Sequence, residues 1–86
     1  VDAGAEAALR RGSSLLPAGV TAIRGTFARG DAVFLLSAEG DALGQGLVRY
    51  DASDAARIVG HRTDEIADLL GYPARGPLVH RDDMAI

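Results

Sequence analysis

The chain has 86 residues, of which 48% are apolar, and its formal net charge is −3. This length fits one small domain with a limited core, and the apolar fraction is too high for a disordered chain. The nine basic residues are outnumbered by twelve acidic ones, which excludes the overall positive field typical of nucleic-acid-binding domains and leaves only a local patch for such contacts.

The lack of cysteine and of long apolar runs excludes further classes of protein. The sequence contains no Cys, which excludes disulfides and thiolate sites and favours an intracellular protein. No apolar run approaches the roughly 18 residues of a membrane span. We therefore expect a cytoplasmic protein with no membrane contact.

The first element is a predicted helix. Asp2 is a suitable N-cap, Ala5, Ala8 and Leu9 recur at helical spacing, and Gly12 is a stop signal. Because the helical pattern begins with the first residues, we expect the chain to be a piece of a longer protein.

Strand signals follow, and they centre on a hairpin. Residues 20–26 are predicted to form a strand, and the apolar run at 32–36 predicts a strand covered on both faces. Residues 38–41 form the predicted turn, and residues 42–50 form the return strand. Gly44 and Gly46 lie two apart on that strand, so we expect a bulge there or the close approach of another backbone or a ligand on their bare face.

After the hairpin, the spacing of the apolar residues changes from that of a strand to that of a helix. Ser53 is the predicted cap of a helix through residue 59, and Thr63 is the predicted cap of a second helix that Gly71 ends. Residues 78–80 and 84–86 have strand character again. The order of elements predicts a mainly β domain with α-helices, an α+β fold whose sheet is mostly antiparallel.

Several short motifs match catalytic or adhesive signatures, and each fits a simpler structural role. His80-Arg81-Asp82 lacks the other parts of the protein-kinase signature and fits a strand end with surface ion pairs. Arg29-Gly30-Asp31 fits a turn. Gly44-Gln45-Gly46 has Arg49 where a dinucleotide fingerprint needs Gly. His61 and His80 have no Cys partners, so the pair is weak evidence for zinc.

The polar cluster Arg10-Arg11-Gly12-Ser13-Ser14 allows two interpretations. Two guanidinium groups at a helix end, followed by hydroxyls and free backbone N–H groups, are suited to clamping phosphates. The same cations are also ordinary at a helix C-terminus, where they complement the dipole. Both interpretations stay open on the sequence.

Four segments together resemble a known family. They are residues 12–20 (GSSLLPAGV), residues 27–33 (FARGDAV), residues 44–50 (GQGLVRY) and the pair formed by residues 65–72 with residues 79–82. Their order and spacing are similar to those of the PUA domain at the C-terminus of bacterial glutamate 5-kinase. The resemblance implies a small β pseudo-barrel flanked by short helices, with residues 1–86 as a single PUA domain cut from a longer chain.

The resemblance also implies a function. The parent enzyme would phosphorylate L-glutamate with ATP and Mg²⁺ in proline biosynthesis, and its kinase domain lies outside this sequence. The 86 residues would then carry no catalytic, cofactor-binding or metal-binding residue, and would act as a regulatory module. Its partners would be the kinase domain in cis and, in a homo-oligomer, a neighbouring subunit, through residues 15–20 and 78–83.

The alternative is an RNA-binding module, because RNA-binding PUA domains meet RNA around the first helix and the loop that follows it. A third possibility, a domain of another PUA protein such as an RNA-modifying enzyme, fits residues 15–20 and 79–82 less well. The predicted contact residues, for RNA or for a protein partner, are Arg10, Arg11, Gly12, Ser13, Ser14, Pro17, Ala18 and Gly19.

Overall fold

A computed structural model describes residues 1–73 and 76–86. The described chain forms a mixed α+β domain, which confirms the predicted fold class. None of its helices is long and apolar enough to cross a membrane. In chain order the elements are α1 (Ala3–Arg10), the 3₁₀ turn η1 (Pro17–Gly19), β1 (Ala32–Leu36), β2 (Ala42–Val48), α2 (Ala52–Ile58), the 3₁₀ turn η2 (Thr63–Glu65), α3 (Ile66–Leu70) and β3 (Val79–Ala85).

The three strands form one antiparallel sheet in the order β1-β2-β3. The predicted hairpin is confirmed: Ala32 lies opposite Leu47 and Phe34 opposite Gln45, and Gly40 takes a φ of +90° in the turn between the strands. A β-branched or bulky residue would be strained there, so glycine suits this turn.

The two glycines of β2 bring β3 close, as the sequence predicts. A Cβ built on Gly44 would lie 2.1 Å from the carbonyl oxygen of Ala85. A Cβ built on Gly46 would lie 2.5 Å from Cγ1 of Val79. The bare face of β2 therefore lets the backbone and side chains of β3 pack directly on it.

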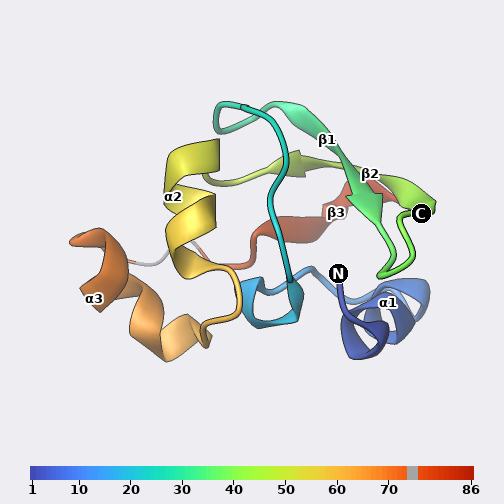
Figure 1. The fold of residues 1–86 in the computed structure, drawn as a ribbon, viewed down its shortest axis with the longest axis horizontal. Coiled ribbons are helices and arrows are strands. Elements are labelled where there is room, and N and C mark those ends of the chain that lie inside the picture. The colour runs from blue at the N-terminus through green and yellow to red at the C-terminus, as the bar shows by residue number, and fades with distance from the viewer. Residues whose placement is uncertain (74–75) are drawn as a thin grey trace.

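The predicted strand at residues 20–26 is wrong. This segment forms no ladder and runs as irregular chain from η1 to the turn before β1 (Figure 1). Gly25 adopts a φ of +74°, which interrupts an extended conformation. Ile23 and Phe27 still pack against the core, so the segment contributes apolar contacts without pairing.

The prediction that β1 is covered on both faces is also wrong. Leu35 is buried, whereas the side chain of Phe34 is 73% exposed. No layer of the described chain covers the outer face of the sheet at this point, so a continuous apolar run here has one buried face only.

Two helix caps differ from the predicted ones. Asp51, and not Ser53, caps α2, because its Oδ1 accepts a hydrogen bond from the backbone N–H of Asp54 at 2.9 Å. Thr63 lies inside η2, and the side chain of Glu65 reaches back to the N–H of Arg62 at 3.1 Å. The predicted cap of α1 is confirmed, since Oδ1 of Asp2 accepts from the N–H of Ala5 at 2.7 Å.

The last strand is one element where the sequence predicts two short pieces. β3 pairs with β2 through Met84 and Ala85 at one end and through Val79 at the other. The register shifts between these points, so residues 80–83 bulge out of the ladder. The bulge carries the exposed Arg81.

The core lies between the sheet, α2 and α1, whose buried residue Leu9 is near the end of the helix. Helices α2 and α3 lie at one end of the domain and α1 at the other, close to the hairpin turn (Figure 1). Tyr50 is 1% exposed, and its hydroxyl donates to the carbonyl of Gly76 at 3.3 Å. The buried apolar residues are Leu9, Leu15, Val20, Leu35, Val48, Tyr50, Ala55, Ile58, Ile66, Leu78 and Val79.

Candidate interaction surface at the end of helix α1

Helix α1 ends in a Schellman motif. The N–H of Gly12 donates to the carbonyl of Leu9 at 3.0 Å, and the N–H of Ser13 donates to the carbonyl of Ala8 at 3.0 Å. Gly12 has a φ of +87°, the left-handed conformation that this motif requires at the residue after the cap. The backbone after α1 is thus held in one conformation, and the predicted contact residues project from a fixed turn.

The two guanidinium groups of this turn are on the surface. Arg10 is an exposed side chain whose Nε lies 3.4 Å from Oε2 of Glu6, one helical turn earlier. Arg11 is exposed and has no ion pair with the described residues. Exposed i,i+4 pairs contribute only about 0.3–0.5 kcal/mol, so an anionic ligand can compete with Glu6 for Arg10.

Ser14 ties this turn to the bulge in β3. The backbone N–H of Arg81 donates to Oγ of Ser14 at 2.8 Å. One residue further, the N–H of Leu15 donates to the carbonyl of Val79 at 2.9 Å. Two segments more than sixty residues apart in the sequence therefore lie side by side.

A small, open pocket of about 270 Å³ lies at their junction. Arg10 and Arg81 line it, together with the backbone turn at Gly12 and Ser13. The remaining lining residues are Leu9, Met84 and Ile86. Two arginine residues among apolar neighbours are a lining suited to a small anionic group such as a phosphate or carboxylate.

Arg81 is the charged residue of this surface that is absent from the contact residues predicted between positions 10 and 19. Its position depends on the bulge in β3 and on its bond to Ser14. The sequence marks residues 78–83 as a contact segment but gives no sign that the segment meets the end of α1.

The net charge of the surface is close to zero. Asp82 and Asp83 follow Arg81 directly and are exposed, and Glu6 already pairs with Arg10. Such a surface can bind one anionic group through geometry, but it lacks the summed positive potential of a nucleic-acid-binding face.

The other predicted contact residues stand apart from this cavity. Pro17 is buried, and its carbonyl accepts from the N–H of Gly60 at 2.8 Å. The carbonyl of Gly19 accepts from the N–H of Asp2 at 3.0 Å, and a Cβ on Gly19 would lie 2.6 Å from the Cβ of Ala5. Ala18 is exposed. Pro17 and Gly19 thus join η1 to α1 and to the end of α2.

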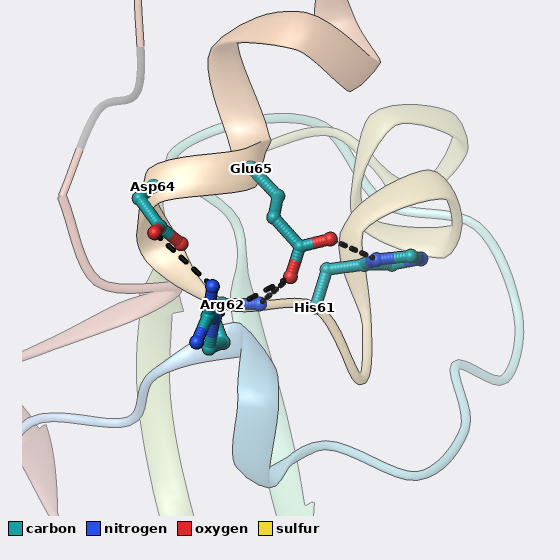
Figure 2. Close-up of polar contacts among 4 residues, drawn as sticks. All are labelled: His61, Arg62, Asp64 and Glu65. Atoms are coloured by element: carbon teal, nitrogen blue, oxygen red, sulfur yellow. Dashed lines mark hydrogen bonds and ion pairs between the residues drawn. The ribbon is translucent and has the colours of Figure 1, made fainter.

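A second polar cluster surrounds η2 (Figure 2). Oε2 of Glu65 lies 3.3 Å from Nδ1 of His61, and Oε1 accepts from the N–H of Arg62. The guanidinium of Arg62 lies 3.3 Å from Oδ2 of Asp64. The backbone hydrogen bond from Arg62, followed by the bond from His61, lowers the pKa of Glu65 below its ordinary value. These contacts cap η2 and are a local structural feature.

The residues with metal-ligating side chains are dispersed. His61 contacts Glu65, while His80 lies 3.5 Å from the carboxylate of Asp82. Among residues 1–73 and 76–86, no group of three or more His, Asp or Glu side chains is placed to hold a metal ion.

Comparison with known proteins places the chain in a family. A family model for the PUA domain matches residues 1–70, so the chain belongs to the PUA domain family. Two solved PUA structures share its fold: a PUA domain from Aeropyrum pernix, with a TM-score of 0.68 and 30% identity over 94% of this chain and 39% of that one, and a conserved PUA domain protein from Thermoplasma acidophilum, with a TM-score of 0.60 and 26% identity over 93% and 45%.

Within that family, the chain is similar over its whole length to the C-terminal part of bacterial glutamate 5-kinases. It is 59% identical to the enzyme from Dinoroseobacter shibae, 58% to that from Paracoccus denitrificans and 52% to that from Brucella anthropi, over 86 residues in each case. All 86 residues are covered, but they span only 23% of each of these relatives.

Proposed function

We propose that this chain is the non-catalytic PUA domain of a glutamate 5-kinase and that it regulates the kinase domain to which it is joined. The observation that carries the proposal is the 52–59% identity along all 86 residues to one end of those enzymes. Identity of this level over all 86 residues is more than a shared fold requires.

The whole enzyme would transfer the γ-phosphoryl group of ATP to the side-chain carboxylate of L-glutamate in the cytoplasm, with Mg²⁺ bound in the kinase domain. The domain would act through contact with that kinase domain or with a neighbouring subunit of a homo-oligomer. The segments we assign to this contact are residues 15–20 and 78–83. They adjoin one another through the bridge between Leu15 and Val79, so one partner can cover both.

Removal of the domain tests this proposal. The full-length kinase and a form that lacks residues 1–86 would be compared for catalytic rate, oligomeric state and inhibition by proline. We expect at least one of the three to change, because a regulatory contact must alter the equilibrium between states of the enzyme. If all three are the same in both forms, the domain has no regulatory role.

A second function, RNA binding, is favoured by one specific feature. The turn after α1 and the bulge of β3 bring Arg10 and Arg81 to the lining of one pocket, and the exposed Arg11 follows Arg10 directly in the chain. Three arginines can neutralise about three phosphates. The logarithm of the binding constant would then fall with a slope of about −2 to −3 against the logarithm of salt concentration.

A salt titration with transfer RNA tests the alternative. Between about 50 and 200 mM salt, three phosphate contacts predict a loss of affinity of roughly 20- to 40-fold. Replacing Arg10, Arg11 and Arg81 together by Ala should abolish this dependence, while Arg24→Ala serves as the matched control. Affinity that is unchanged in the triple variant would show that RNA does not bind at this surface.

A further inference from the structure

The outer face of the sheet is apolar, and no other part of the described chain covers it. Ala32 lies opposite Leu47, and Phe34 lies opposite Gln45. Because side chains alternate along a strand, these four share one face, on the opposite side from the buried Leu35. Phe34 is 73% exposed and Leu47 is 45% exposed, and they are diagonal neighbours at about 7–8 Å. The exposed apolar side chains of the hairpin therefore form one continuous surface.

Strand β3 extends this surface. Ala85 is exposed and lies opposite Gln45, on the other side of β2. We call the five residues together the sheet patch: Ala32, Phe34, Gln45, Leu47 and Ala85. Neither β1 nor β2 contains a charged residue, although charged side chains are a usual means of preventing association at an exposed edge strand such as β1. A clustered apolar surface without charges is typical of a protein interaction site.

The size of the sheet patch favours a partner in the same chain. It consists of five residues, whereas a stable interface between separate proteins has about 20–30 residues on each side. A covalently joined partner needs fewer contacts, because its effective concentration reaches the millimolar range. A second copy of this domain has no such advantage.

The chain enters the domain beside the sheet patch. The nitrogen of Val1 donates to the carbonyl of Leu36 at 2.8 Å, so the first residue lies at the end of β1. Phe34 is two residues away along the strand, a distance of about 7 Å. The chain is similar to the C-terminal part of relatives of which it spans 23%. In such an enzyme the kinase domain is attached next to the sheet patch.

We infer that the kinase domain of the same chain packs on the sheet patch and that Phe34 is the central side chain of this contact. The inference rests on the proposed function, because it takes the chain to be the C-terminal domain of a glutamate kinase. The contact is separate from residues 15–20 and 78–83. The kinase surface that fits is apolar and carries one hydrogen-bonding group for Gln45, since the buried side-chain amide needs a partner.

Photo-cross-linking in the full-length kinase tests the inference. Phe34 would be replaced by the photoreactive analogue p-benzoylphenylalanine, and the same analogue at Ala56, an exposed residue of α2, is the matched control. We expect position 34 to cross-link to a peptide of the kinase domain and position 56 to form no such product. Absence of a product from position 34, or a product with a second copy of this domain, would overturn the inference.

Mixed isotopic labelling identifies the chain that is cross-linked. In enzyme assembled from ¹⁵N-labelled and unlabelled subunits, the two peptides of each product should carry the same label. Products that join a labelled peptide to an unlabelled one would show that a neighbouring subunit covers the sheet patch, which contradicts the inference.

A charge placed on the sheet patch gives a second readout. Phe34→Glu should release the domain, because a carboxylate is costly to bury without a partner, and limited proteolysis just before Val1 should become about tenfold faster. Ala56→Glu places the same charge on α2 and should leave the rate unchanged. Equal rates in the two variants would overturn the inference. Slow hydrogen exchange at the amide of Val48, which donates to Asp31, verifies that the hairpin is intact.

These measurements are independent of catalysis and of inhibition by proline. A cross-link from position 34 in an enzyme whose regulation does not need the domain would refute the proposed regulatory role and support the contact. Regulation that needs the domain, without a cross-link from position 34, would overturn the contact alone.

Discussion

The contact between Gly46 and β3 makes Gly46→Ala the most informative single substitution for the fold. The new methyl carbon would lie 2.5 Å from Cγ1 of Val79 and 3.1 Å from the carbonyl oxygen of Asp83. Val79 is fully buried, so it cannot rotate into open space. Overpacking of this kind costs about 1–3 kcal/mol, and in a domain of this size each kcal/mol lowers the melting temperature by about 4–8 °C.

Urea unfolding followed by circular dichroism measures this cost. Gly4→Ala is the matched control, because a Cβ at Gly4 meets nothing closer than 3.5 Å in helix α1 and should stabilise the helix by about 0.5–1 kcal/mol. The two glycine-to-alanine changes are thus expected to have opposite signs.

A double-mutant cycle locates the cause. Val79→Ala removes the clashing carbon, so Gly46→Ala should cost less in that background, with a coupling of about 0.5–3 kcal/mol. If Gly46→Ala does not change the free energy of unfolding, β2 does not pack closely on β3. The same conclusion follows if its cost is equal with Val and with Ala at position 79.

Three further predictions concern local contacts. Asp51→Ala should lower the free energy of unfolding by about 1 kcal/mol in urea unfolding, because the N–H of Asp54 loses its cap; no change would mean that water replaces the cap. Tyr72→Phe should cost about 1 kcal/mol in the same assay, since the hydroxyl donates to the carboxylate of Asp54 at 2.7 Å; equal stability would show that this bond is not formed in solution. The lowered pKa of Glu65 means that its ionised form is favoured by folding, so its contribution is present above the ordinary pKa of 4.5 and is lost as the pH falls through the lowered value. Glu65→Gln should therefore flatten the dependence of stability on pH below about 4.5, and an unchanged acid profile would contradict the contacts with Arg62.

Local signals predicted the elements that local interactions determine. The hairpin depends on an apolar run and a turn with Gly40 at positive φ, and both are visible within ten residues of sequence. Helix α1 depends on Asp2 and Gly12, which lie next to its two ends. The glycines of β2 predicted a close approach because glycine weakens a strand unless a bulge or a neighbouring backbone needs the space.

The wrong predictions concern segments whose structure depends on contacts with another element of the fold. Residues 20–26 have strand character, but a strand needs an edge to pair with, and a pocket of about 560 Å³ lies between this segment and β1. The exposure of Phe34 has the same origin, because an apolar run indicates burial and does not show which face is covered. Asp51 replaced Ser53 as a cap because two nearby polar residues compete and the first one has the better position.

The candidate site is only partly predictable for the same reason. Arg10 and Gly12 are close together in the sequence, whereas Arg81 reaches them through the bulge of β3 and the bond to Ser14. A register shift of this kind depends on how β3 packs against β2, and a single sequence carries no direct sign of it.

The proposed regulation of a glutamate kinase by this domain would be measured as a change in the concentration of proline that halves activity. It would be determined in the full-length enzyme and in a variant with a Gly-Ser sequence in place of residues 1–86. We expect the half-inhibitory concentration to change by about fivefold or more, the lower end of typical coupling between sites. The same concentration in both forms, with unchanged catalytic rate and oligomeric state, would contradict the proposed regulatory role.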